Sequence, residues 1–529
     1  MESFYADPCF AIALASIIAI FGWRFISTRA LCGSKENRIA KAFPPGPWAW
    51  PIIGNMHLLG NLPHKVFRDL SLRYGPVVGL RLGQKPAIAV CSSTLAREVL
   101  RTYDKVFANR PDFKLYDELF YPEDSGIVMT TQSSEWRTHR KICTSLFTSK
   151  RLQEMEHSRL QEVSNLLCDI VKESAQGEKQ ISIRSYVSRM SARLFMRLLQ
   201  SESSFHAGGE DLPDLITQVE HQASWPLIGD LIPVLSWLDF WNLKRVRAVH
   251  NRVDTVLSAI IDQRLRETAK SSIVYDDLLQ SLLSRLVDPN RTPENSEVDE
   301  ALTIREVKGI ILDVLAGGIH TTALTIEWGV AELLKHPSCL RRLRQEMDEL
   351  LGDKKARLIV EDDLQKLTYL QCVIKEISRL HPVLPMLVPR MSSEECELGG
   401  YKIPAGTLTF VNAWAIGRDD NVWEKALEFR PERFEYKNIE IKGQCYELLP
   451  FGSGRRMCAG LPVAISMVGL TLANLVHCFN IELPDGQSPE TVNTEEKNGI
   501  SANKAVPTVI LPKPRFPMDF YRSPPAAAA

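Results

Sequence analysis

One apolar segment constrains the fold of this 529-residue chain more than any other feature. Apolar residues recur with a helical period through residues 304–335, and His336-Pro337 then ends the pattern. Thr303 and Glu306 have the spacing of a capping box, which marks the start of a helix. About 32 residues at a rise of about 1.5 Å each make a helix of roughly 48 Å. A helix this long and this apolar has to cross the middle of the protein.

The remaining sequence predicts a mainly α fold with small β-sheets. Most of the chain up to about residue 380 has helical periodicity, but alternating apolar residues around a Gly83-Gln84-Lys85 turn predict a β-hairpin at residues 74–90. Short strands and loops follow residue 380, with one last apolar helix at residues 462–479. Because no repeat or low-complexity segment divides residues 56–515, we expect a single body.

Composition excludes several classes of protein. The net charge is −1, so the overall charge of the chain gives no indication of a nucleic-acid partner. The 11 cysteines form no C-x-x-C pair, which argues against a zinc site, and a chain of this size is unlike a small disulfide-bonded scaffold. We expect ten of the eleven to be reduced thiols that pack as small apolar side chains.

The first 28 residues predict a membrane anchor. Residues 8–23 are almost wholly apolar, and Arg24 and four more basic residues follow by residue 41, which places the body in the cytosol. A cleaved signal peptide is the alternative, but no basic region precedes the apolar run. We expect an anchor at 1–28, a basic and proline-rich linker at 29–55, a body at 56–520 and a tail at 521–529.

Residues 451–460 (FGSGRRMCAG) carry the most specific chemistry. Cys458 immediately precedes an apolar helix, where backbone N–H groups and the helix dipole lower the pKa of a thiol. Gly454 permits a tight turn, Gly460 permits close approach of a flat ligand, and Arg456 is suited to binding a carboxylate. A thiolate held in this way is the ligand that a haem iron needs for O–O cleavage.

The same segment resembles the haem-binding signature of the cytochrome P450 family, F-x-x-G-x-R-x-C-x-G, at Phe451, Gly454, Arg456, Cys458 and Gly460. The resemblance implies the cytochrome P450 fold, haem b as cofactor and Cys458 as the iron ligand. It is closest to the plant microsomal type, as residues 499–507 (GISANKAVP) also suggest. It therefore implies a single-pass protein of the endoplasmic reticulum membrane, with a cytosolic haem-thiolate catalytic domain at residues 56–520.

Other matches to the family follow in the same order along the chain. Glu376 and Arg379 match the E-x-x-R pair, which in the family is locked by an arginine of a later segment, here Arg433. The side chains that the resemblance implies to contact the haem propionates are Trp136, Arg140 and Arg390.

The oxygen-activation segment departs from the family pattern, A/G-G-x-D/E-T-T/S. Thr321 matches the threonine that holds a water at the bound oxygen, and the Gly317-Gly318 pair would leave room for O2. His320 occupies the position of the usual acid. An imidazole also relays protons near neutral pH, so two hypotheses stay open: a histidine relay, or a packing residue with water as the proton source.

Substrate contacts follow from family analogy alone: Ser125, Ile319, Leu384, Leu387 and Ile500. They imply a lipophilic or aromatic small molecule, such as a phenylpropanoid, flavonoid, terpenoid or amino-acid derivative.

Two functions remain open. The first is a monooxygenase that uses O2 and electrons from NADPH-cytochrome P450 reductase, because the chain itself has no dinucleotide fingerprint. The second is a haem-thiolate isomerase or dehydratase that needs neither O2 nor a reductase; Thr321 argues against it. A haem carrier or sensor without catalysis has no positive evidence in the sequence.

Overall fold

The computed structural model describes residues 42–121, 125–200, 206–207, 210–270, 277–286, 301–354, 356–497 and 499–522. The predicted anchor, residues 29–41 of the linker and most of the tail lie outside these residues. Within them the chain is mainly helical, as predicted, with small sheets. The helices are α2 (Pro63–Tyr74), α3 (Ser93–Arg97), α4 (Lys114–Leu119), α5 (Ser134–Ser145), α6 (Ser149–Glu154), α7 (Glu156–Glu173), α8 (Ile183–Gln200), α9 (Leu212–Ala223), α10 (Ile228–Leu231), α11 (Phe240–Lys270), α12 (Leu278–Leu283), α13 (Ile304–Lys335), α14 (Pro337–Leu351), α15 (Glu361–Leu364), α16 (Thr368–Leu380), α17 (Ala413–Ile416), α18 (Arg433–Tyr436), α19 (Leu461–Cys478) and α20 (Met518–Arg522).

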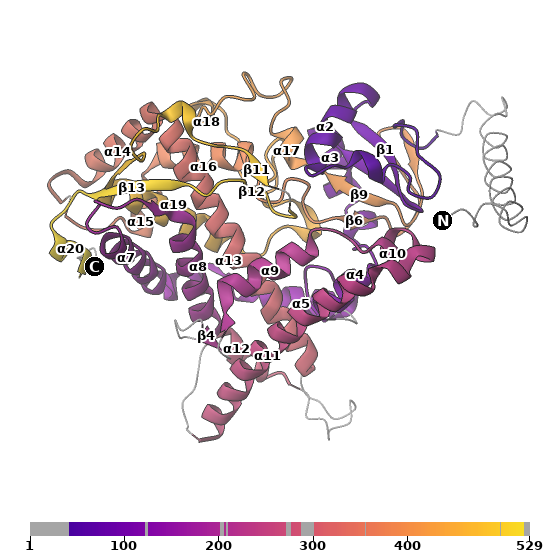
Figure 1. The fold of residues 1–529 in the computed structure, drawn as a ribbon, viewed down its shortest axis with the longest axis horizontal. Coiled ribbons are helices and arrows are strands. Elements are labelled where there is room, and N and C mark those ends of the chain that lie inside the picture. Colours follow the sequence, from indigo (N-terminus) through magenta and orange to yellow (C-terminus); the bar gives the residue numbers. More distant parts are fainter. Residues whose placement is uncertain are drawn as a thin grey trace, which may run out of the picture.

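The largest sheet has four strands in the order β1 (Val77–Leu82), β2 (Lys85–Val90), β9 (Leu408–Val411) and β6 (Arg390–Met391). The predicted hairpin is confirmed, because β1 and β2 pair antiparallel with Leu82 opposite Lys85. A second sheet joins β10 (Phe479–Glu482), β13 (Val509–Pro514) and β3 (Ile181–Ser182). Figure 1 shows the first sheet with α2 and α3 at one end of the molecule, and most of the helices, with β13, in the remainder.

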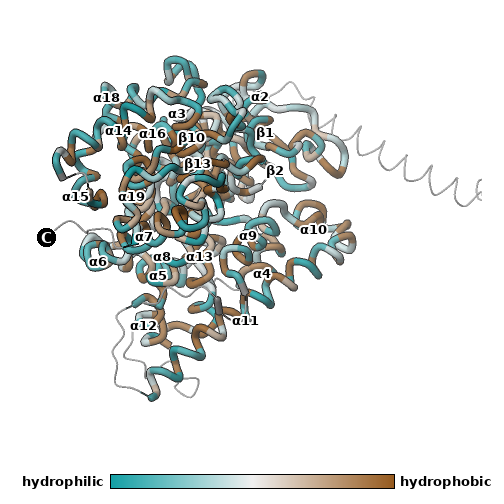
Figure 2. The backbone as a smooth tube through the Cα atoms, turned by 60° about the vertical axis from the view of Figure 1, so that its left-hand side comes forward, coloured by the Kyte–Doolittle hydropathy of each residue, from teal (hydrophilic) through white to brown (hydrophobic). Residues whose placement is uncertain are grey.

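Helix α13 is the predicted central helix, and its N-terminus has the predicted capping box between Thr303 and Glu306. Most of its side chains are buried, and it packs against α8, α9, α16 and α19. Helices α13 and α19 are long and apolar enough to cross a membrane, yet most of each apolar stretch is buried inside the body. In Figure 2 the hydrophobic segments accordingly gather around these helices and β10.

A buried carboxylate joins the two ends of the body. Glu496 accepts a hydrogen bond from the Trp414 indole at 2.8 Å and contacts His64 Nε2 at 3.0 Å and Lys65 Nζ at 2.8 Å. Burial alone would raise the pKa of Glu496, but the bonds from His64 and Lys65 outweigh it and lower the pKa to about 2. This contact ties α2 to the C-terminal segment.

Candidate active site

The Cys458 loop precedes α19 and folds back on itself. The backbone N–H of Cys458 donates to the carbonyl of Phe451 at 3.0 Å. Gly454 has a φ of +71°, and a Cβ there would lie 2.3 Å from the carbonyl oxygen of Leu100, so only glycine fits this turn. At Gly460 a Cβ would lie 3.9 Å from Cys458 Sγ, so the missing side chain keeps the space beside the sulfur open.

The pKa of the Cys458 thiol is raised, not lowered. Burial raises it, and this outweighs the N–H groups of Gly460 and Leu461 and the guanidinium of Arg140, all of which lower it. The expectation of a lowered pKa is therefore wrong for the protein alone, because the N–H groups at the start of α19 do not outweigh the desolvation of the thiol. A metal cation at the sulfur would reverse this balance, since a coordinating thiol is deprotonated outright.

Cys458 lines a cavity of about 300 Å³. The lining includes Phe451 and the Cys458 loop, together with Gly317, Gly318 and Thr321 of α13. Cys143 of α5 also lines the cavity, but burial raises its pKa to about 12, so it stays a protonated thiol. Of the two cysteines that line the cavity, Cys458 is therefore the one whose sulfur lies near backbone N–H donors.

Four arginines reach the same cavity: Arg110, Arg140, Arg390 and Arg456. Arg456 donates to the carbonyls of Ala108, Ile127 and Thr130 at 2.6–2.9 Å, and its guanidinium lies 4.2 Å from the ring centroid of Trp136. Trp136 also lines the cavity and donates its indole N–H to the carbonyl of Ile127 at 3.1 Å.

The other three arginines also donate to backbone carbonyls. Arg140 donates to Met457, and Arg390 donates to Phe107 and Ser453 at 3.3 Å each. Arg110 donates to Val128, Val388 and Pro389 at 2.7–3.0 Å.

This gathering of charge favours an anionic ligand. Burial lowers the pKa of Arg110 well below its usual value, and the nearby Arg456 and Arg390 lower it further. Burial lowers the pKa of Arg390 to about 10. Buried cations that crowd one another are stabilised by carboxylates. Haem b carries two propionates and an iron that a thiolate can ligate, so the arginines and the Cys458 thiol fit this cofactor.

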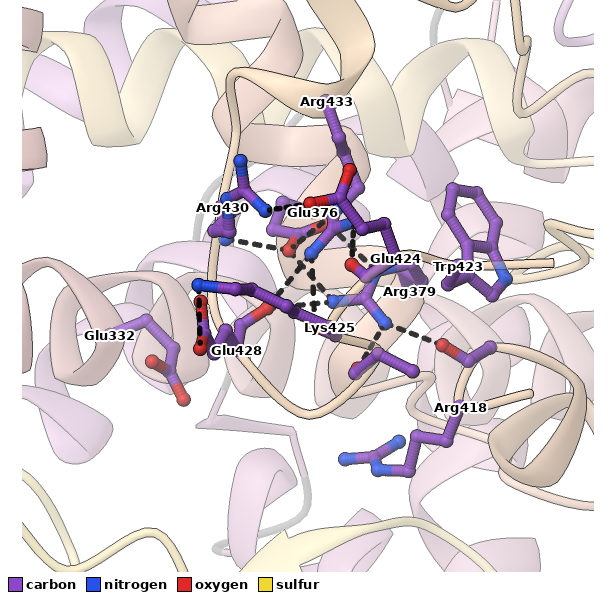
Figure 3. Close-up of polar contacts among 12 residues, drawn as sticks. Glu332, Glu376, Arg379, Arg418, Trp423, Glu424, Lys425, Glu428, Arg430 and Arg433 are labelled. Carbon is purple, nitrogen blue, oxygen red and sulfur yellow. Dashed lines mark hydrogen bonds and ion pairs between the residues drawn. The ribbon is translucent and has the colours of Figure 1, made fainter. Parts of the chain in front are cut away.

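A second buried network lies outside the cavity (Figure 3). Arg379 donates two hydrogen bonds to Glu376 at 2.7 and 2.8 Å, and Arg433 donates to the same carboxylate at 3.1 Å. The backbone N–H of Arg430 adds a bond at 2.7 Å. Arg379 also binds the carbonyls of Gly417, Ala426 and Glu428, at 2.5–3.0 Å. The structure thus brings together Glu376, Arg379 and Arg433. Their hydrogen bonds attach the loop before α18 to α16.

The two glycines of α13 have different surroundings. A Cβ at Gly317 would meet nothing within 4 Å, whereas one at Gly318 would lie 2.1 Å from the ring of Phe195. Both glycines line the cavity, and Gly318 also makes room for the ring of Phe195 of α8. The hydroxyl of Thr321 donates to the carbonyl of Gly317 at 2.6 Å.

His320 is turned away from this space. Its side chain is not among the groups lining the cavity in the described part of the chain. Nε2 lies 2.9 Å from Asn503 Oδ1 and 3.2 Å from Glu220 Oε2. Burial lowers the pKa of His320, with the Asn503 hydrogen bond opposing it, so the ring is neutral at pH 7. Direct contact between His320 and a ligand in the cavity is thus excluded in this conformation.

Comparison with known proteins decides the family. Residues 44–509 match the family model "Cytochrome P450". The chain belongs to the cytochrome P450 family. Flavonoid 3'-monooxygenase of Petunia hybrida is 35% identical over 92% of this chain and 95% of that protein. Geraniol 8-hydroxylase of Catharanthus roseus is 35% identical, over 90% and 95%. A zebra fish cytochrome P450 solved with progesterone superimposes with a TM-score of 0.70 at 25% identity, over 86% of this chain and 99% of that one. The enzyme is a cytochrome P450 monooxygenase that binds haem b.

The expected substrate contacts of this cytochrome P450 divide into two groups. Leu384 and Leu387 line the cavity, whereas Ser125, Ile319 and Ile500 do not. Ser125 and Ile319 are buried, and a Cβ on Gly309 of α13 would lie 2.1 Å from the Ser125 carbonyl, so Ser125 packs against the helix instead. Ile500 donates its N–H to Ser224 at 3.1 Å. The cavity lining thus includes two of the five side chains that family analogy named, and their contact with substrate stays a prediction.

Sequence reasoning missed three residues around the cytochrome P450 cavity. Arg110 is a basic residue in an aromatic, proline-containing stretch, which is a weak sequence signal for a functional position. Asp313 of α13 is half-buried and accepts hydrogen bonds from the N–H groups of Ile127 and Val128 at 2.5 and 2.9 Å, which fixes this loop at the cavity. Glu220 carried no local signal, because it meets His320 only through packing of α9 on α13.

Proposed function

We propose that this cytochrome P450 hydroxylates a small lipophilic or aromatic specialised metabolite, with O2 and with electrons that NADPH-cytochrome P450 reductase delivers. The observation that carries the proposal is that apolar side chains line the same cavity as Cys458, among them Phe195, Val314, Leu384 and Leu387. Relatives named as hydroxylases of a flavonoid and of geraniol support this substrate class.

We propose roles for the cavity residues on the same basis. Cys458 ligates the haem iron, and Arg140, Arg390, Arg456 and Trp136, together with Arg110, hold the propionates. When bound, the haem supplies the iron that activates O2, with electron density supplied by the thiolate. The guanidiniums bind and neutralise the carboxylates, while the apolar wall excludes water and orients the substrate. Thr321 holds a hydroxyl proton beside the open space at Gly317.

The proposed location is the endoplasmic reticulum membrane, with an anchor at residues 1–28, a linker at 29–55 and the catalytic domain at 56–520. An exposed apolar surface supports contact between the body and a lipid bilayer. It spans η4 (Pro233–Asp239) and the start of α11, where Trp237 and Trp241 are 70% and 68% exposed. Tryptophan is the residue type enriched at membrane interfaces, and a patch of this kind is rare on a monomeric soluble protein.

The proposed reductase contact is the outer face of α5. Arg137 and Lys141 are exposed there, while Trp136 and Arg140 of the same helix face the cavity. An acidic partner docked on this face would lie close to the haem edge.

The test is a spectral and turnover screen of the purified holoenzyme. Members of a panel of flavonoids, terpenoids and phenylpropanoids should shift the haem absorption by displacing water from the iron, and those ligands should be hydroxylated only with NADPH, O2 and reductase. Product formed without NADPH would overturn the monooxygenase proposal in favour of an isomerase or dehydratase. For the membrane contact, W237E/W241E should weaken binding to vesicles, relative to a L72E control on exposed α2.

A further inference from the structure

A buried histidine of α5 connects a loop at the cavity to α13. The side chain of His139 is 1% exposed. Its Nδ1 lies 3.0 Å from the carbonyl oxygen of Gly126, and its Nε2 lies 3.2 Å from Glu306 Oε1 at the start of α13. A carbonyl oxygen and a carboxylate oxygen both accept hydrogen bonds, so each ring nitrogen has to carry a proton to bond with its neighbour. The two contacts together therefore call for the imidazolium form of His139.

The charges around the ring favour the same form. Burial alone would lower the pKa of His139, but the hydrogen bonds to Glu306 and Gly126 outweigh it, and the pKa lies above its ordinary value. Burial alone would raise the pKa of Glu306, but the hydrogen bonds from His139 and Thr303 lower it to about 2, so this carboxylate is charged at neutral pH. The charged side chains next to the ring, in space or along its own helix, are Glu306 and Asp313 of α13 and Glu135 and Arg140 of α5.

The carbonyl that His139 binds belongs to a loop whose next two residues, Ile127 and Val128, line the cavity. Trp136, three residues before His139 on α5, donates its indole N–H to the carbonyl of Ile127 at 3.1 Å. Two side chains of α5 thus hold two successive carbonyls of this loop. The second bond of His139 ties the same helix to the start of α13, so one imidazolium joins the loop, α5 and α13.

We propose that His139, as an imidazolium bonded to both Gly126 and Glu306, is a positioning residue that holds the loop at residues 126–128 for the binding of an apolar ligand. His139 is not among the described residues that line the cavity, so it acts through Ile127 and Val128. When the pH rises through the folded pKa of His139, one ring N–H is lost, and either the loop or α13 is released from α5. Affinity for the ligand then falls. Its importance for turnover rests on the proposed function.

Binding of a small apolar probe tests this role without turnover. 4-Phenylimidazole ligates a haem iron through nitrogen and adds an aromatic ring to imidazole, which serves as the small reference ligand. At about pH 7.5 the haem-loaded H139Q variant should bind 4-phenylimidazole about tenfold more weakly than the wild type, the lower end for loss of a hydrogen bond to a charged group. Its affinity for imidazole should change by less than about twofold.

The matched control is H157Q, at an exposed histidine of α7, which should bind both probes as the wild type does. Equal affinities of H139Q and the wild type for 4-phenylimidazole would overturn the proposal.

The pH profile distinguishes an imidazolium from a side chain that only fills space. From about pH 7.5 to about 9.5 an ordinary imidazole is uncharged, as the free probes are. Over this range the wild-type affinity for 4-phenylimidazole, relative to imidazole, should fall through a titration that H139Q lacks.

E306Q tests the partner of His139 without removing the start of α13. Glutamine still accepts the backbone N–H of Thr303, so the capping box is kept, but its amide N–H2 faces His139 Nε2 and favours the neutral ring. The titration should therefore move to lower pH. H139Q/E306Q should bind 4-phenylimidazole no more weakly than H139Q, because both substitutions remove one contact. A titration that persists in H139Q, or one that E306Q leaves in place, refutes the proposal.

These outcomes are separable from failure of the proposed function. If no ligand is hydroxylated with NADPH but H139Q shows the expected loss and the expected pH profile, the positioning role stands and the proposed function fails. If a hydroxylated substrate is found but H139Q binds 4-phenylimidazole as the wild type does, only the role of His139 is wrong.

Discussion

The network around Glu376 gives the sharpest test of what holds this structure together. The Glu376 carboxylate is fully buried and accepts hydrogen bonds from Arg379, Arg433 and the backbone of Arg430. Glutamine at this position keeps the shape but removes the charge, and its amide N–H2 faces guanidinium donors. Two arginines then remain buried without their anion. Removing one partner of a buried ion pair costs roughly 3–5 kcal/mol.

The assay is urea unfolding of the holoprotein, followed by circular dichroism. With an m value of about 3 kcal/mol per M, a loss of about 4 kcal/mol lowers the midpoint by roughly 1 M. The control is E482Q, which breaks the ion pair of Glu482 and Lys513, both about half exposed, and should cost about 0.5 kcal/mol or less. Equal midpoints for E376Q and E482Q would refute the reasoning, because burial would then add nothing to the pair.

Three further predictions concern the cavity and the pH response. C458A should abolish the absorption band of the reduced carbon monoxide complex; survival of the band would mean that another group ligates the iron. G318A should lower the melting temperature, since its Cβ would overlap Phe195, with a cost of about 1–3 kcal/mol, and G317A, which meets nothing, should not. Glu496, with a folded pKa of about 2, stabilises the protein above its unfolded pKa and loses this stabilisation as the pH falls toward 2. E496Q should therefore flatten the acid limb of a stability-against-pH curve; an unchanged limb would contradict this.

The features that the sequence predicted depend on contacts between near neighbours. The capping box of α13 joins residues three apart, the β1–β2 hairpin closes over two residues, and Glu376 and Arg379 lie one helical turn apart. The Cys458 segment has its glycines, arginine and cysteine at fixed spacing within ten residues. Each of these patterns lies within a short stretch of the chain, so the roles of its side chains can be predicted without knowledge of the fold.

The tertiary structure decided which groups meet across the chain. Arg110 reaches carbonyls 278 and 279 residues away, which makes it part of the cation cluster at the cavity. Phe195 occupies the space at Gly318, and Glu220 meets His320, because α8 and α9 pack against α13. Desolvation by the surrounding protein raises the pKa of Cys458, whereas its position before a helix predicts the reverse.

The sequence by itself therefore determined the family and the cofactor, and it singled out the thiol that we propose as the iron ligand. Only the tertiary structure determined the surroundings of that thiol: what each glycine of α13 faces, which leucines line the cavity and which acid lies next to His320. The physical reason is that the cysteine motif lies within one local loop. Substrate fit and proton supply depend instead on burial and on the packing of helices distant in sequence.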